Sequence, residues 1–572
     1  MLRKSLLGTA LTVVVAAALA ACSGTDEGAA ESDGGLTPDA QPDARPVPDA
    51  EPPTDAGTDA RDAADAADAE PPCTTAADCA ARAEKNAIAR YDAALKVPAD
   101  LRAFLKAVPK GADLHNHLTG AVYAETFLAL AAADGNCIDT TTHRAVGSGS
   151  CTASTLPTPS PGTPFFEEVV RAWSMKDFVA GGETGRDHFF ATFGKFGLIA
   201  GGHRDQSIAD VLRRAADENQ LHVETMFNMG RNIGTLSASL FSGTLHPEDL
   251  PALYDSIIND PTFATELGQD LAVVNGAAQA YKTDLGCAGA TPAAGCKVGV
   301  RFVAQVARTG PNDNIFGQLI SAFEMAAQTP HIVAANLSSP EDDTTSLNNY
   351  GLHMAMLDFL YQKYVPTGLS PLHITLHAGE LVPQYLPPAH ANANTFHIRD
   401  AVQIGHAERI GHGLDVLSET DSALLLDEMA TKNVLVEICL SSNDQILEVK
   451  GTNHPLAEYL KKNVPVALAT DDQGVSRSSM AGEYSRAALD QKLTYLQLKR
   501  MARDSLEHAF LPGPSLWTSL GTKAVVIDCA PTATVLVGDT PSATCQAFLD
   551  GSERAAMQWE LEKRFLAFEK KQ

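Results

Sequence analysis

Imidazole and carboxylate side chains follow an apolar run in the second half of this chain. His377 and Glu380 stand three residues apart, directly after residues 372–376. An imidazole in such a place can hold a metal ion, and a carboxyl group kept partly protonated by its surroundings can pass a proton to a bound substrate. The pair therefore predicts proton transfer beside a metal centre, provided that the chain supplies further ligands.

Further candidate ligands lie earlier and later in the chain. His115 and His117 form a His-X-His pattern, and the two-residue period of a strand would point both imidazoles to one side, as two ligands of one metal ion require. His377 and a carboxylate from Asp471 would complete a set of nitrogen and oxygen donors that suits zinc and leaves one position for water. His412, between two glycines, would stand near the same centre.

Each of these motifs also has a structural explanation. A single His-X-His pair is more often found on a surface or loop than on a metal ion. The run Thr470-Asp471-Asp472 is typical of a turn or a helix cap, and His412 can be a hydrogen-bonded loop histidine. The metal site is favoured because the motifs follow different strands of one predicted fold.

Eight short runs have the composition of buried strands and alternate with helix-like stretches. The first strand lies within residues 109–118, and the others are residues 221–227, 298–308, 331–337, 372–376, 409–412, 434–440 and 464–470. The helix-like stretches include residues 316–327, 348–364, 418–432 and 454–462. This alternation predicts an α/β fold, a TIM-type (β/α)8 barrel. A doubly wound open sheet is the alternative, disfavoured because no Gly-X-Gly-X-X-Gly follows an early strand.

In a barrel of this kind the carboxyl ends of all strands meet at one mouth. The polar residues after strands one, five, six and eight would therefore face one another. These residues are His115, His117, His377, Glu380, His412, Asp471 and Asp472.

The rest of the chain is predicted to form segments around this barrel. They are a signal peptide at 1–22, a disordered acidic Ala/Asp/Pro linker at 23–72, an N-terminal helical extension at 73–111, the barrel at 112–520, a disulfide-closed insertion at 521–549 and a C-terminal helix at 550–572. Within the barrel, a long insertion at 135–220 follows strand one and is expected to form a lid or an oligomer contact.

Residues 1–22 resemble a bacterial lipoprotein signal. Arg3 and Lys4 precede an apolar run that ends in small residues and Cys22. Acylation of Cys22 would anchor the mature protein to a membrane at the cell envelope, at the outer membrane or the cell surface. A plain signal peptide is the alternative, and the protein would then be secreted.

The net charge is strongly negative. The formal charge of −27 divides into +2 for residues 1–22, −12 for residues 23–72 and −17 for the remainder. The linker cannot bury a core and is expected to be extended by self-repulsion. The negative charge of the remainder argues against nucleic acid as a partner, because phosphate binding requires a basic face.

The cysteine pattern fits an exported protein. Eight of the ten cysteines form close pairs that would each close a short loop: Cys73/Cys79, Cys137/Cys151, Cys287/Cys296 and Cys529/Cys545. Cys22 is assigned to lipid, and Cys439 is left alone within an apolar run. Local disulfides in an oxidising compartment are therefore expected. A metal-binding cysteine cluster is disfavoured because the chain contains no Cys-X-X-Cys.

Five segments form an ordered series of motifs. They are Pro109-Lys110…Leu114-His115-Asn116-His117-Leu118…Gly120, His377-Ala378-Gly379-Glu380, Arg409-Ile410-Gly411-His412-Gly413, Glu437-Ile438-Cys439…Ser441-Ser442-Asn443 and Thr470-Asp471-Asp472. Together they resemble the adenosine deaminase family of metal-dependent barrel hydrolases. Within the same region, residues 173–193 are more similar to the secreted, growth-factor-related branch than to the compact cytosolic enzymes.

The resemblance implies a reaction and a role for each residue. One zinc ion per chain would be bound by four residues: His115, His117, His377 and Asp471. The ion would make hydroxide available near neutral pH. His412 and Asp471 would orient the attacking water and accept its proton, and Glu380 would protonate N1 of a purine.

The same resemblance implies how the substrate would be held. Asp472 would hydrogen-bond N7, the backbone at Gly379 would meet N3, and adenosine or a closely related 6-aminopurine nucleoside would give inosine and ammonia. Thr119 stands where the family has an acidic residue that contacts the ribose, and Ser339 stands in the turn after strand four. Both are expected to contact the substrate. Deamination of AMP, adenine or a modified purine is an open alternative.

Other classes of protein fit less well. A cytidine-type zinc deaminase needs His-X-Glu followed by Pro-Cys-X-X-Cys, and His406-Ala407-Glu408 supplies only the first half. A two-metal hydrolase needs a bridging group such as a lysine after strand four, which residues 336–339 lack. A secreted binding or signalling protein with a deaminase-like barrel is the alternative from another class. The sequence also leaves open a homodimer.

Overall fold

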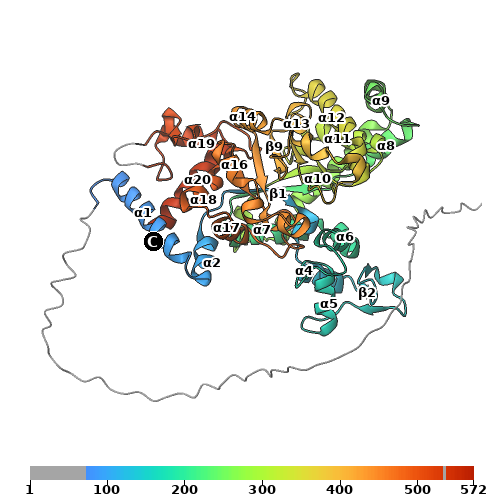
Figure 1. Ribbon diagram of the computed structural model, residues 1–572, viewed down its shortest axis with the longest axis horizontal. Helices are drawn as coiled ribbons and strands as arrows, with labels where there is room; N and C mark the ends of the chain where they lie inside the picture. The colour runs from blue at the N-terminus through green and yellow to red at the C-terminus, as the bar shows by residue number, and fades with distance from the viewer. Residues whose placement is uncertain (1–72, 532–535) are drawn as a thin grey trace, which may run out of the picture. The chain divides into compact units, whose positions relative to one another are not determined.

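Eight parallel strands form one sheet, in the order β1-β5-β6-β7-β8-β9-β10-β11, in the computed structural model (Figure 1). Their bounds are β1 Ala112–His117, β5 His222–Phe227, β6 Gly299–Ala307, β7 Ile332–Ser338, β8 His373–Ala378, β9 Arg409–His412, β10 Leu435–Ile438 and β11 Val466–Leu468. The strands are buried along almost their whole length, which explains why each one reads as an apolar run in the sequence.

The structure describes residues 73–531 and 536–572. The predicted signal peptide, its acyl anchor at Cys22 and the acidic linker fall within residues 1–72, outside the described residues. In the described part of the chain, no helix combines the length and the apolar character that crossing a membrane would need.

The sheet closes into a barrel between its first and last strands. The N–H of Asp471 donates to the carbonyl of His115 across 2.8 Å, and the N–H of His117 donates to the carbonyl of Asp471 across 3.2 Å. Asn116 and Asp471 form the parallel bridge between them. The predicted TIM-type barrel is confirmed, and its closure brings the strand-one histidines next to the strand-eight carboxylate.

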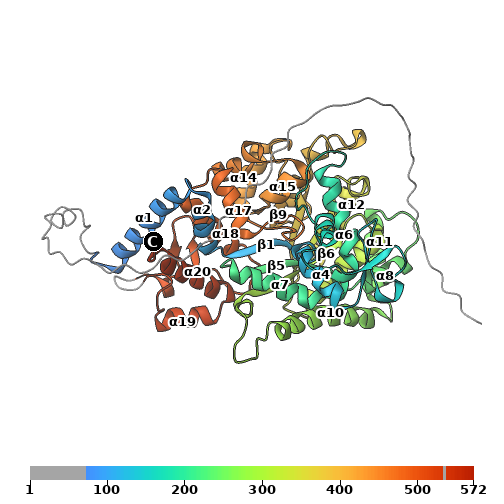
Figure 2. The ribbon, with the colours of Figure 1, turned by 90° about the horizontal axis from the view of Figure 1, so that it is seen from below.

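Helices follow the strands and pack outside the barrel (Figure 2). They are α8 Asn232–Leu240, α9 Leu250–Ile258, α10 Phe263–Asp284, α11 Asn312–Ala326, α12 Thr344–Tyr364, α13 His397–Gln403, α14 Ser422–Lys432, α15 Leu440–Leu447, α16 Leu456–Lys461, α17 Met480–Leu489 and α18 Tyr495–Glu507. The four predicted helices are confirmed as α11, α12, α14 and α16. Helix α14 begins later than predicted because Asp421, with φ of 52°, stands in a left-handed turn before it.

The two ends of the described chain pack together beside the barrel (Figure 1). The predicted N-terminal helical stretch is divided into α1 (Ala76–Ala94) and α2 (Pro98–Ala107), and Pro98 begins α2 because a first-turn residue needs no N–H donor. The ring of Phe104 lies 5.2 Å from that of Phe568 on α20 (Glu553–Glu569). The elements between α18 and α20 are β12 Trp517–Ser519, β13 Ala524–Val525 and α19 Ala543–Asp550.

The insertion after β1 has its own small core. After the short helices α3 (Leu118–Ala121) and α4 (Ala124–Ala133), it contains β2 Cys137–Asp139, β3 Ala145–Val146, β4 Thr155–Pro157, α5 Pro164–Ala172, α6 Gly185–Gly202 and α7 Arg204–Asp217. Phe196 of α6 stacks on Phe127 at 5.1 Å and packs against Trp173 at 6.0 Å. This apolar contact fixes α6 relative to the start of the barrel.

The predicted cysteine pairs are confirmed. Four disulfides join Cys73 to Cys79, Cys137 to Cys151, Cys287 to Cys296 and Cys529 to Cys545. Cys439 is free and buried.

Candidate active site

Three imidazoles and one carboxylate converge at the mouth of the barrel. Nε2 of His377 lies 3.1 Å from Nε2 of His115 and 3.1 Å from Nε2 of His117. Oδ1 of Asp471 lies 3.3 Å from Nε2 of His117 and 3.7 Å from Nε2 of His115. A tetrahedral zinc ion with bonds of about 2.0–2.1 Å holds its ligand atoms about 3.3 Å apart, so the spacing of the three imidazole nitrogens fits one such ion, and Asp471 lies beside two of them.

Burial favours the neutral form of two of these imidazoles. It lowers the pKa of His117 to about 4 and the pKa of His377 well below its usual value, and the nearby His115 adds to both shifts. Burial also acts to lower the pKa of His115, but the hydrogen bond and charge of Glu437 outweigh it and raise that pKa. A neutral imidazole is the form that binds a metal ion, so the donors suit the proposed role.

Buried partners fix which ring nitrogen of the histidines carries the proton. Oε2 of Glu437 lies 2.7 Å from Nδ1 of His115, and Oδ1 of Asn336 lies 2.6 Å from Nδ1 of His377. Both oxygens accept, so each Nδ1 donates and each Nε2 keeps its lone pair for a metal ion. Arg409 donates to Oε1 of Glu437 across 2.7 Å and holds that carboxylate in place. No role was predicted for Glu437, Asn336 or Arg409 from the sequence, although a polar residue within an apolar strand is a signal of a buried polar contact.

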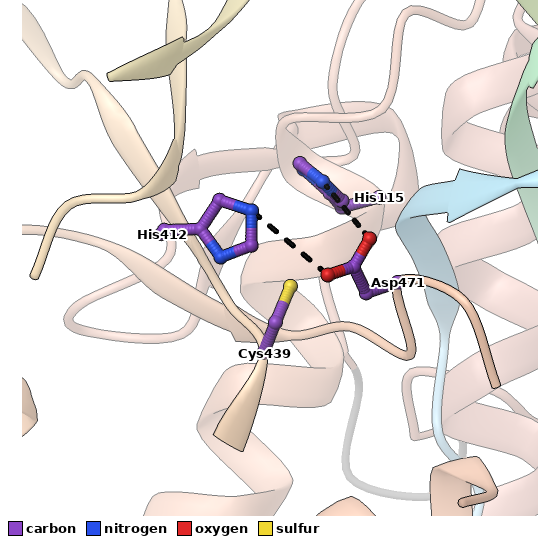
Figure 3. Close-up of side chains that lie close together, drawn as sticks. All are labelled: His115, His412, Cys439 and Asp471. Carbon is purple, nitrogen blue, oxygen red and sulfur yellow. Dashed lines mark ion pairs between the residues drawn. The ribbon is translucent and has the colours of Figure 1, made fainter. Parts of the chain in front are cut away.

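His412 stands on another side of Asp471 (Figure 3). Its Nε2 lies 3.9 Å from Oδ2 of Asp471 and 3.7 Å from Oε1 of Glu380. Nδ2 of Asn443 donates to Nδ1 of His412 across 2.9 Å, which leaves the ring proton on Nε2. Burial lowers the pKa of His412 to about 3, so the ring is neutral. His412 can therefore donate a hydrogen bond from Nε2 toward this centre, and Asp471 can accept one.

Cys439 is close to the same group of residues (Figure 3). Its Sγ lies 3.9 Å from the carbonyl oxygen of Glu437. Burial raises the pKa of the thiol well above its usual value of 9, so the sulfur keeps its proton. Because a thiolate is the form that binds metals, the three histidines and Asp471 are the better ligand set.

Two carboxyl groups near the ligands have raised pKa values, which favours their protonated form. Burial raises the pKa of Glu380 well above its usual value, and the charges of Asp471 and Glu341 add to this shift. Burial and the charge of Asp471 do the same for Asp472. Oδ1 of Asp472 has no hydrogen-bond partner among the described residues and packs on Gly120, where an added Cβ would lie 1.6 Å away. Both carboxyl groups can donate a proton to a ring nitrogen.

The N–H groups of Gly379 and Glu380 donate to one carboxylate. Oε1 of Glu341 accepts this N–H across 3.2 Å, and Oε2 of Glu341 accepts the N–H of Glu380 across 2.8 Å. The N–H of Gly379 therefore has a partner within the protein. Ser339, which has a φ of 85° just after β7, lines the cavity. Glu341 had no role in the sequence prediction.

A cavity of about 420 Å³ lies over these side chains, a volume typical of small-molecule sites. Most of the residues predicted for the site line it: His117, Thr119, Ser339, His377, Glu380, His412, Asp471 and Asp472. Gln305, Pro340 and Ile446 complete this wall together with residues of the insertion. The wall contains three acidic side chains and neither lysine nor arginine.

Helix α6 of the insertion covers one side of the cavity. Phe189, Phe190 and Phe193 line it with an apolar surface. Nε of Arg186 donates to Oδ2 of Asp342 across 2.7 Å, and the guanidinium of Arg186 also lies over the ring of Phe190. This pair ties α6 to the loop after β7. The insertion therefore contributes to the site, as expected for a lid, and no sequence motif marked these phenylalanines.

The fold and the site together define a class: TIM-type barrels that carry a histidine and aspartate ligand cluster at the carboxyl ends of their strands. Residues 253–516 match the model of the adenosine deaminase family. This region of the chain is therefore similar to the adenosine deaminase family.

Curated relatives align with parts of the chain. It is 30% identical over 145 residues to the adenosine deaminase of Clostridium perfringens (strain SM101 / Type A), which covers 25% of this chain and 39% of the relative. It is 26% identical over 216 residues to the adenosine deaminase of Photorhabdus laumondii, which covers 37% of this chain and 56% of the relative. The chain thus spans less than two thirds of the length of these relatives.

Solved structures with similar folds include other deaminases. An adenine deaminase from Arthrobacter aurescens is 21% identical with a TM-score of 0.43, over 70% of this chain and 94% of that one. An Arabidopsis N6-mAMP deaminase is 20% identical with a TM-score of 0.43, over 71% and 95% of the two chains.

Proposed function

We propose that this protein is a zinc-dependent hydrolase that converts adenosine, or a closely related 6-aminopurine, to inosine and ammonia. One observation carries the proposal. Nε2 of His377 lies 3.1 Å from Nε2 of both His115 and His117, and Oδ1 of Asp471 lies 3.3 to 3.7 Å from the same two atoms. The carboxyl group of Glu380, whose pKa is raised by burial, lines the same cavity. A metal site beside a proton donor is what hydrolysis of an aromatic amidine requires.

The four ligand residues would hold one zinc ion per chain. When bound, zinc acts as a Lewis acid that makes hydroxide available near neutral pH. The two oxygens of Asp471 have different roles. Oδ1 faces the imidazoles of His115 and His117, while Oδ2 faces Nε2–H of His412 and is free to accept the proton of the attacking water.

Glu380 would supply the proton that activates the purine. Its carboxyl group donates to N1, which draws electrons from C6 and makes that carbon electrophilic. The oxygen of water bonds to C6 while Asp471 takes one of the protons of water. The bond from C6 to the amino nitrogen then breaks, and the nitrogen leaves as ammonia with that proton. The remaining hydroxyl proton passes to Glu380 and restores its acid form. C6 becomes the carbonyl carbon of the hypoxanthine ring.

The cavity wall suits the rest of the base. The protonated Asp472 can donate to N7, which is an acceptor in the purine ring. Phe189, Phe190 and Phe193 offer an apolar surface on which a flat ring can pack. Thr119 would face the part of the substrate beyond the base.

Ammonia release from adenosine tests this proposal. Purified protein is stripped with a chelator, and half of the sample is reloaded with one equivalent of zinc. The proposal predicts ammonia and inosine from the reloaded sample and a large loss of activity in the stripped one. If the zinc-replete protein releases no ammonia from adenosine, deoxyadenosine, AMP or adenine, the hydrolase assignment is wrong and a binding or signalling role becomes the better one.

We place this activity outside the cytoplasm, anchored through an acylated Cys22. The four disulfides support an oxidising compartment, since cytosolic proteins rarely keep such bonds. Labelling of cells with radioactive palmitate should mark the wild-type protein. The Cys22→Ala variant should stay unlabelled, and equal labelling of both would refute the anchor.

A further inference from the structure

A second cavity adjoins the catalytic one. It has a volume of about 450 Å³ and lies between the end of α6, the start of α7 and the loop after β5. Thr119 lines both cavities, so the two lie next to each other at this residue. The polar residues of the second cavity are Thr119, Arg204, Ser207, Asn228 and Arg231.

The two cavities differ in charge. The second wall contains two arginines and no acidic residue, whereas the catalytic wall contains three acidic residues and three histidines but neither lysine nor arginine. A ligand that spans both would therefore have its hydrogen-bonding base in the catalytic cavity and an anionic group beside the arginines.

Neither arginine is neutralised within the described residues. Arg204 and Arg231 form no ion pair there, whereas Arg186 pairs with Asp342. When the side-chain amide of Asn228 is turned so that its oxygen faces Arg231, that oxygen accepts from Nη2 of Arg231 across 3.2 Å. Asp205 follows Arg204 in the chain. Burial raises the pKa of Asp284, and the negative charge of Asp205 raises it further. Arginine forks with no carboxylate partner are suited to a phosphate group.

We infer that the second cavity binds the 5′-phosphate of the substrate, and that the substrate is a 6-aminopurine nucleoside monophosphate. This inference rests on the proposed function and names its substrate class. Thr119 is a neutral hydroxyl donor at the junction, so no negative charge there opposes a phosphate on its way between the cavities. Arg204 and Arg231 would be specificity-determining residues, because they would recognise the part of the substrate that adenosine lacks.

Steady-state kinetics of ammonia release with AMP and adenosine test the inference. The proteins are the zinc-loaded wild type, Arg204→Gln, Arg231→Gln and, as a matched control, Arg213→Gln, whose guanidinium on α7 donates to the carbonyl of Asp284. We expect kcat/KM to be higher for AMP than for adenosine in the wild type. Each cavity variant should lower the AMP-to-adenosine ratio at least about tenfold, and the control should not. An adenosine preference in the wild type, or a ratio that the variants leave intact, would overturn the inference while the deaminase proposal stands.

A binding measurement separates the two proposals. If no purine releases ammonia, the proposed function has failed, and calorimetry on the zinc-loaded protein with AMP, adenosine and inorganic phosphate still decides the inference. Tighter binding of AMP than of adenosine, lost in both cavity variants and weakened by inorganic phosphate in competition, supports the phosphate site. Equal affinities for AMP and adenosine would contradict it.

Discussion

Glu341 holds the backbone of Glu380 in place. Its Oε2 accepts the N–H of Glu380 across 2.8 Å, and its Oε1 accepts the N–H of Gly379 across 3.2 Å. Nδ1 of His397 donates to the same Oε1 across 2.6 Å, and the ring of His397 stacks on Tyr350 with centres 3.6 Å apart. These contacts join the loop after β7 to the turn after β8, and they fix where the proposed proton donor stands.

The Glu341→Gln variant should lose activity while it keeps its zinc. The amide has a single acceptor oxygen, so one of the two N–H groups faces an NH2 group and the turn shifts. We expect kcat to fall about 10- to 100-fold, the range in which small misplacements of a catalytic group act. Ammonia release and metal analysis measure the two quantities. A matched control is Glu408→Gln, whose carboxylate pairs with the exposed His373 at 2.8 Å. Wild-type kcat in Glu341→Gln would contradict a positioning role.

The barrel and most of the ligand cluster could be predicted from the sequence for a physical reason. Strands buried on both faces must be apolar, so all eight could be identified, and a parallel barrel brings their carboxyl ends together whatever the lengths of the loops. Glu341 could not be found in this way. It and His397 are 56 residues apart, and contacts between distant loops leave no periodic signal. The phenylalanines of α6 and the pair Arg204 and Arg231 escaped prediction for the same reason.

Glu437 should control the affinity for zinc. It accepts the Nδ1 proton of His115 and shares Arg409 with Glu224, and all four side chains are buried. In Glu437→Gln the amide presents an NH2 group to one of these donors. We expect zinc affinity to fall about 10- to 100-fold, as measured by competition with a fluorescent chelator. Thr375→Val, which removes only a neutral hydrogen bond to the same carboxylate, should have a smaller effect. Equal affinities in all three proteins would rule out this role.

Stability in acid should depend on Glu224. Burial acts to raise its pKa, but the charge of Arg409 and the nearby His222, whose Nε2 lies 3.5 Å from Oε1 of Glu224, outweigh burial and lower the pKa to about 2 from its usual 4.5. The folded state then binds this proton less readily than the unfolded state. The stabilisation is complete above pH 4.5 and is lost as the pH falls toward 2, and it amounts to at most about 3 kcal/mol. Urea unfolding between pH 5 and pH 2 should give a free energy of unfolding that depends less on pH in Glu224→Gln than in the wild type. Identical pH dependence in the two proteins would refute this role of Glu224.

The pair of Arg186 and Asp342 should affect substrate binding through α6. Breaking it with Arg186→Leu or Asp342→Asn frees the helix that carries Phe189, Phe190 and Phe193. We expect each change to raise KM about fivefold or more with little effect on zinc content, and the double variant to be no worse than either single one, because both remove the same contact. Additive effects in this double-mutant cycle would show that the two residues act independently.

The central claim is that Glu380 delivers a proton to a purine held beside a zinc ion. The most direct measurement compares the zinc-replete wild type with Glu380→Gln for ammonia release from adenosine and AMP, with zinc content determined on the same samples. The account predicts one zinc per chain in both proteins and a rate several orders of magnitude lower in the variant, because the amide cannot act as the acid. A variant that binds zinc and releases ammonia at the wild-type rate would contradict it.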